Sequence, residues 1–119
     1  MITYEQYLEK FKECSRLAAS AEPWDYKTIN KNHDKMHNIV RKIYGLRKEK
    51  LFFDEVFSSK ERCVQMWGAC FSEIFNYDLK KSHELFLEES QSTTARSIDI
   101  IGAKIAVERL EKKLKDLSI

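Results

Sequence analysis

Apolar residues recur every three or four positions along most of the chain, which is the spacing of one face of an α-helix. In the first segment, which begins at Thr3, this face consists of Tyr4, Tyr7, Leu8, Phe11, Cys14 and Ala18. Thr3 and Gln6 have the spacing of a capping box, in which each side chain meets the other residue's backbone amide. Pro23 follows and predicts the end of this first helix.

The same periodicity predicts further helices over residues 25–44, 48–57, 58–75, 78–89 and 95–117. Ser58 with Glu61 forms a second capping-box pattern, and Asp78 is a suitable N-cap for the helix that follows it. Gly45 suits the left-handed position that often ends a helix. One proline and three glycines provide too few turn residues for many short strands.

Two of the predicted helices carry apolar residues on more than one face. The helix over 48–57 places Leu51, Phe52 and Val56 on one face and Phe53 and Phe57 on another. The helix over 95–117 carries one stripe of Ile98, Ile101 and Ile105 and a second of Ala103, Val107, Leu110, Leu114 and Leu117. Apolar residues on two faces indicate burial on two sides.

The predicted fold is therefore all-α, with about six helices joined by short turns. The helix over 25–44 pairs with the helix over 48–57, and the helix over 58–75 pairs with the helix over 78–89, followed by the last helix. Stacked hairpins of this kind are typical of a helical solenoid, or superhelix. A chain of 119 residues corresponds to one domain, so we expect a single helical domain over 1–119.

Charge balance, the length of apolar runs and the cysteines limit the classes of function that this chain is expected to have. Lys and Arg number 21 against 19 Asp and Glu, and this near balance argues against nucleic acid as a partner. The longest apolar run, Met66–Phe71, is far shorter than a membrane-spanning helix, and the first residues do not form a secretory signal. Three cysteines, Cys14, Cys63 and Cys70, cannot all pair, and their places on apolar stripes indicate a reducing compartment, the cytoplasm.

A local excess of positive charge leaves one alternative open. Residues 41–50 contain Arg41, Lys42, Arg47, Lys48 and Lys50 against a single acid, Glu49. A helix end accounts for such a run, because cations are favourable at the negative end of the helix dipole. The alternative is a nucleic-acid-binding patch, which predicts salt-dependent binding of DNA or RNA.

Candidate chemistry is sparse. His33 and His37 are four residues apart, so a helix places both on one face, where they could share a metal ion. A third ligand is required, and His83 is the only other histidine. A cysteine–histidine nucleophile would need Cys and His side chains to meet, but cysteines within apolar stripes are usually inert. We therefore expect no metal, no cofactor and no enzymatic activity.

One resemblance points to a function. The segments NHDKMHNIVRKIYGLR, LFFDEVFSSKERCVQMWGACFSEI and TTARSIDIIGAKIAVERL, within residues 32–112, resemble a small bacterial family of HEAT-like helical proteins classed as a domain of unknown function. The middle segment of that family contains a valine-basic-x-Trp-Ala-Ala helix. Val64, Trp67 and Ala69 occupy matching positions here, whereas Gln65 replaces the basic residue and Gly68 replaces an alanine.

Members of this family are often immunity proteins of bacterial toxin systems, including contact-dependent growth inhibition. The resemblance implies a protein that binds a toxin's C-terminal domain, commonly a nuclease, and covers its active or substrate site. In a HEAT-like stack the second helix of each hairpin lines the concave face. The partner-binding residues expected from this arrangement, taken to be exposed acids with aromatic anchors at the edge, are Asp54, Glu55, Glu84, Glu88 and Glu89, with Trp24 and Tyr26.

Overall fold

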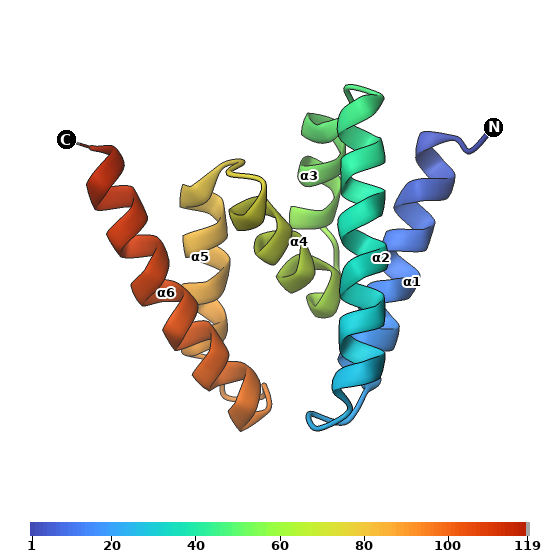
Figure 1. Cartoon of the computed structure of the whole chain (residues 1–119). Helices are drawn as coiled ribbons and strands as arrows, with labels where there is room; N and C mark the ends of the chain where they lie inside the picture. Colours follow the sequence, from blue (N-terminus) through green and yellow to red (C-terminus); the bar gives the residue numbers. More distant parts are fainter. Residues whose placement is uncertain (119) are drawn as a thin grey trace. The chain divides into compact units, whose positions relative to one another are not determined.

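A computed structural model describes residues 1–118 of the chain, and this part contains six helices and no strand (Figure 1). The helices are α1 (Tyr4–Ser20), α2 (Tyr26–Gly45), α3 (Glu49–Phe57), α4 (Arg62–Ile74), α5 (Leu79–Ser90) and α6 (Ser97–Leu117). The all-α prediction with six helices is confirmed. Contacts group the chain into an N-terminal unit, Met1–Trp67, and a C-terminal unit that begins at Gly68. The helices that pack along one another are α1 with α2 and α5 with α6, rather than α2 with α3 and α4 with α5 as predicted. The expected single domain and the stacking of one hairpin on the next stay predictions.

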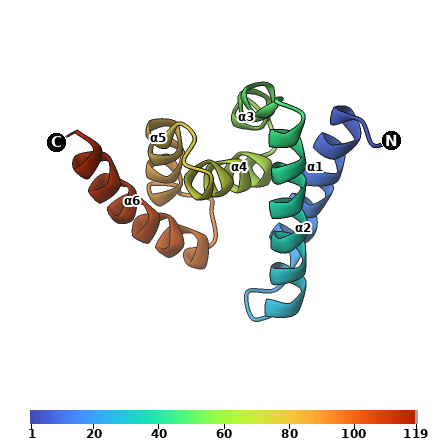
Figure 2. The same cartoon turned by 45° about the horizontal axis from the view of Figure 1, so that its top comes forward.

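The N-terminal unit is built on the hairpin of α1 and α2, which lie side by side and antiparallel in both views (Figures 1 and 2). The predicted capping box is confirmed: the Thr3 amide donates to the Gln6 side chain at 2.9 Å, and the Gln6 amide donates to the Thr3 hydroxyl at 3.2 Å. A bidentate ion pair between Arg16 and Glu61, at 2.7 and 2.8 Å, ties α1 to the segment before α4.

Aromatic rings fill the core of this unit. Phe11 of α1 and Phe52 of α3 are fully buried and meet edge to face, with ring centroids 4.9 Å apart. Phe53 lies 5.1 Å from Phe52 and stacks on Phe57 at 5.6 Å. Both faces of α3 are therefore buried, as the two apolar sets predicted. Leu51 is the exception, because its side chain is 43% exposed.

The C-terminal unit consists of the end of α4 with α5 and α6, and α5 packs along α6. The buried Ser82 hydroxyl of α5 donates to the Ala69 carbonyl of α4 at 2.7 Å. A buried carboxylate, Glu73, is 7% exposed and joins α4 to α6. It accepts hydrogen bonds from Arg109 at 2.6 and 2.7 Å and from Lys113 at 2.8 Å.

Two predicted helix ends are wrong. The helix predicted from Ser58 begins at Arg62, because the Ser58 hydroxyl donates backward to the Asp54 carbonyl, and the Glu61 amide instead donates to Ser59. Gly45 remains helical, and Arg47, with φ of 58°, takes the left-handed conformation two residues later.

Of the two stripes predicted on the last helix, one is exposed and the other is buried only in part, because Leu117 at its end is 69% exposed. Ala103, Val107 and Leu110 of α6 face the core, whereas the side chains of Ile98, Ile101 and Ile105 are each more than half exposed. Within residues 1–118 no helix is both long enough and apolar enough to cross a membrane.

Candidate partner-binding surface

The turn between α1 and α2 presents two aromatic side chains to solvent. The Asp25 amide donates to the Glu22 carbonyl at 2.9 Å, and the Tyr26 amide donates to the Trp24 carbonyl at 3.0 Å. Asp25 also caps α2, because its carboxylate accepts the Thr28 amide at 3.2 Å. Trp24 is 72% exposed and Tyr26 is 70% exposed, which makes this turn an ordered aromatic edge. Both residues were expected at a partner-binding edge, and their exposure agrees with that expectation.

A band of cations runs along α2 and beyond its end. Lys27, Lys31, Lys35 and Lys42 are spaced by four, four and seven residues, so they share one face of the helix. We define the basic face as these four residues together with Arg41, Arg47 and Lys48. All seven are exposed, and none forms an ion pair with any of residues 1–118.

The near-neutral total charge does not reveal that positive charges are concentrated on α2 and the residues after it. Residues 26–48 contain seven of the chain's 21 lysines and arginines but only one of its 19 acids, Asp34. The remaining residues therefore carry an excess of acid. The patch expected at residues 41–50 is thus the end of a longer surface, which also includes Lys27, Lys31 and Lys35, three residues that were not expected there. Their four-residue spacing is visible in the sequence.

The N-terminal half of the basic face does not stabilise the helix that carries it. Cations are favourable near a helix C-terminus, which accounts for Arg41 and Lys42. Lys27 is in the first turn of α2, at the positive end of the dipole, and that turn contains no acid. Like charges four residues apart, such as Lys27 with Lys31, each cost about 0.2–0.5 kcal/mol. Helix stability therefore does not explain the N-terminal half of the basic face.

The unfavourable position of Lys27 at the N-terminus of α2 can be tested by substitution. Lys27→Glu is expected to stabilise the protein by about 1 kcal/mol, because it places an acid at the helix N-terminus and a favourable Glu–Lys pair with Lys31. Lys42→Glu, at the opposite end of α2, should destabilise the protein. Thermal unfolding of both variants at low salt would measure the difference, which should shrink at high salt. Equal shifts for the two variants would contradict the argument.

The five acids predicted to meet a partner are divided between the two units. Asp54 is exposed but paired with Lys50 at 2.8 Å. Glu55, also on α3, is only half exposed and lies near the Tyr4 hydroxyl, whose pKa is raised by burial and by this carboxylate.

On α5, Glu84 is exposed and lies 3.6 Å from Lys81, and Glu88 is exposed. Glu89 is only 8% exposed, so its predicted place on an exposed surface is wrong. It is on the side of α5 that also buries Leu85 and Ser82, four and seven residues earlier.

The histidine pair lies at the edge of the N-terminal core. His33 and His37 are both half-buried, and the His33 ring meets the Trp67 ring edge-on with centroids 5.9 Å apart. His83 belongs to the other unit, where it lies 3.2 Å from Glu111. Among residues 1–118 no three His, Cys, Asp or Glu side chains are grouped to hold a metal ion.

The three thiols are protonated near neutral pH. Burial raises the pKa of Cys14 and Cys63, and it raises the pKa of Cys70 to about 11. Cys14 is buried, while Cys63 and Cys70 are half-buried. None of the three therefore has the lowered pKa that a nucleophilic cysteine needs at neutral pH.

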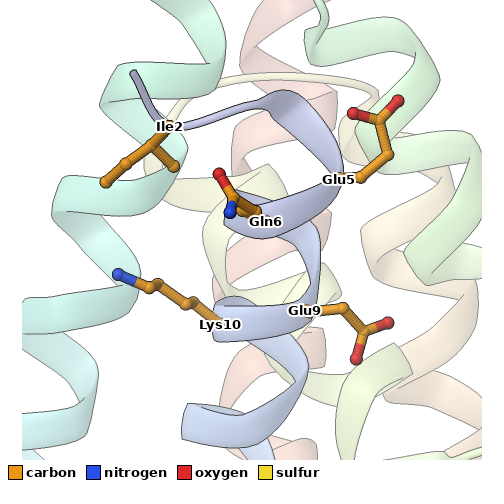
Figure 3. Close-up of a pocket in the computed structure, with 5 residues that line it drawn as sticks. All are labelled: Ile2, Glu5, Gln6, Glu9 and Lys10. Carbon is orange, nitrogen blue, oxygen red and sulfur yellow. The ribbon is translucent and has the colours of Figure 1, made fainter.

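A shallow hollow lies beside the first turns of α1 (Figure 3). Its lining consists of Ile2, Glu5, Gln6, Glu9 and Lys10. Figure 3 shows Ile2 and Lys10 on one side of the helix and the two glutamates on the other. This surface is built from one helix and its leading residue and is open to water, so it lacks the enclosing walls of a small-molecule site.

The surface with the most unusual composition is therefore the aromatic edge and the basic face next to it. Comparison with known proteins adds no assignment: the sequence matches no protein-family model, and no curated protein or solved structure gives a significant match.

Proposed function

We propose that this chain is an immunity protein, which binds the toxic domain of a bacterial toxin and blocks its active or substrate site. The observation that carries the proposal is the aromatic edge. Trp24 and Tyr26 are about 70% exposed on an ordered, hydrogen-bonded turn. Trp and Tyr are the residue types most enriched among those that dominate binding energy at protein interfaces. The resemblance over residues 32–112 supports the same class of function.

The partner of such a protein is expected to be encoded beside its gene. Co-expression with the C-terminal domain of that neighbouring toxin should restore growth, and the two purified proteins should form a one-to-one complex. Continued growth arrest together with the absence of a complex would overturn the proposal.

Replacement of the aromatic edge should weaken this complex. Trp24→Ala with Tyr26→Ala is expected to reduce affinity for the toxin domain at least 100-fold, because truncating a dominant interface residue costs about 2 kcal/mol or more. Isothermal titration calorimetry would measure the loss. Leu117→Ala, which removes an exposed side chain from α6, is the matched control and should leave affinity unchanged.

The acids on α5 define the competing surface. Glu84→Lys with Glu88→Lys should weaken the complex if the toxin domain contacts this helix, without changing the helical content. Loss of affinity in this variant, together with normal affinity in the aromatic variant, would transfer the interface from the aromatic edge to α5.

A further inference from the structure

The positive charges of the basic face are arranged in a line along α2 and are not gathered at one point. Lys27, Lys31 and Lys35 follow one another at intervals of about 6 Å along α2, since each residue advances about 1.5 Å. Lys42 continues the same side of the helix. The four lysines therefore span about 22 Å along the helix axis. Arg47 and Lys48 follow the last turn, where the Lys48 amide donates back to the Ile43 carbonyl. A ligand that contacts the whole basic face must therefore be long and negatively charged along its length.

No acid among residues 1–118 forms an ion pair with the basic face. Asp34, the single acid among residues 26–48, lies 3.9 Å from the His33 ring. Lys27, Lys31, Lys42 and the arginines of the basic face form no ion pair within residues 1–118. Asp34 lies on the same side of α2, three residues after Lys31, and its side chain is 83% exposed, so it lowers the net positive charge of the basic face by one. Asn30 and Asn38 are exposed amides on the same helix, able to hydrogen-bond to phosphate or base oxygens.

The aromatic edge lies at the N-terminal end of the basic face. Trp24 and Tyr26 immediately precede Lys27, and both rings are open to solvent. Cations along a backbone path combined with exposed rings are the features that bind single strands, because unpaired bases stack on aromatic side chains. In a duplex the bases are already stacked and cannot reach such rings.

We propose that the basic face and the aromatic edge bind single-stranded nucleic acid, with phosphates along α2 and bases stacked on Trp24 and Tyr26. This inference does not rest on the immunity function. An acidic protein surface is the competing ligand, since it would also complement the cations. The regular spacing and the terminal rings favour a strand, because a strand supplies one charge and one flat base per nucleotide.

The test uses the full chain and a fluorescein-labelled 20-nucleotide oligothymidylate, with binding followed by anisotropy. Micromolar binding is expected at 50 mM salt, weakening as salt rises, because each phosphate contact releases counterions. The variant Lys27→Glu/Lys31→Glu/Lys35→Glu should lose at least tenfold in affinity. Its salt dependence should also be shallower by about two in the log–log slope. Absence of binding by the unmodified chain at 50 mM salt would overturn the proposal.

A matched variant separates this surface from total charge. Lys80→Glu/Lys104→Glu/Lys112→Glu alters three exposed lysines outside the basic face and changes the net charge by the same amount. It should bind the oligonucleotide as the unmodified chain does. An equal loss in the two triple variants would show that binding is non-specific and would overturn the assignment. Circular dichroism of each variant checks that the helices remain folded.

The rings are tested separately from the cations. Trp24→Ala with Tyr26→Ala should weaken oligothymidylate binding about tenfold or more while leaving the salt slope unchanged, since stacking releases no counterions. A 20-base-pair duplex should bind more weakly than the single strand. Equal duplex binding with no effect of the ring substitutions would overturn the single-strand assignment. Poly-L-glutamate competing as well as the oligonucleotide would assign the surface to an acidic polypeptide instead.

Discussion

Truncation of Phe52 to alanine is expected to lower the free energy of unfolding by about 3–5 kcal/mol. The Phe52 side chain is fully buried and contacts the rings of Phe11 and Phe53. Its removal therefore takes away both its own burial and the edge-to-face contacts that join α3 to α1. For a chain of this length, the melting temperature should fall by roughly 15 °C. Urea or thermal unfolding followed by circular dichroism would measure the change.

The neighbouring residue provides the control. Leu51→Ala removes a side chain that is 43% exposed. We expect it to cost less than about 1 kcal/mol, because little of its surface leaves water on folding. A similar loss in Leu51→Ala and Phe52→Ala would contradict the core assigned to α3.

The second large effect is expected in the C-terminal unit. Arg109→Met combined with Lys113→Met should cost about 3 kcal/mol, because Glu73 would remain buried without its two cations. This is the lower end of the range for breaking a buried ion pair, since both cations are themselves half exposed. Adding Glu73→Met should recover most of the loss, because a buried ion network and a hydrophobic replacement often have similar stability.

The ion network of Glu73, Arg109 and Lys113 also makes the stability of the protein depend on pH. Burial by itself raises the pKa of Glu73, yet the hydrogen bonds from Arg109 and Lys113 outweigh it and hold the pKa below the ordinary 4.5. A carboxyl with a lowered folded-state pKa stabilises the protein above its ordinary pKa and loses this contribution as pH falls through the folded value. In the Arg109→Met/Lys113→Met variant, burial should raise the pKa instead.

The stability gap between the unmodified chain and this variant should therefore narrow as pH falls from 7 to about 4. Urea unfolding at a series of pH values would follow it. A gap that stays constant with pH would show that the loss comes from packing rather than from the charge of Glu73.

Most of the fold could be predicted from local sequence. Thr3 with Gln6 forms a capping box whose geometry depends only on nearby residues, and this prediction is confirmed. Ser58 with Glu61 has the same pattern, yet the Ser58 hydroxyl donates to the Asp54 carbonyl in the preceding helix. A serine can act at the end of one helix or the start of the next, and the pattern alone does not distinguish the two.

Burial was harder to predict where a helix carries apolar residues on two faces. Leu51 and the isoleucines of α6 fit helical stripes as well as their buried neighbours do. Which stripe becomes the core depends on the helices packed against it, and periodicity carries no information about those partners. The acid Glu89 shows the converse case, because its charge indicated exposure while its position on α5 buries it.

The candidate surface was predictable in part. The turn after Pro23 indicated that Trp24 and Tyr26 would be exposed, and both are. The basic face was underestimated because net charge averages over the whole chain, whereas a ligand responds to the charges on one face. Lys27, Lys31 and Lys35 become part of one surface only when α2 is viewed as a helix.

The protonated thiols have a practical consequence for observing that surface. A thiol with a pKa of about 11, as at Cys70, is ionised in only about one molecule in ten thousand at pH 7. An exposed cysteine, with a pKa near 8.5, is ionised in roughly one in thirty. A cysteine introduced at the exposed Asn38, in the middle of the basic face, would therefore react with a maleimide dye far faster than Cys70. A fluorophore could be attached at this site with the native cysteines left in place.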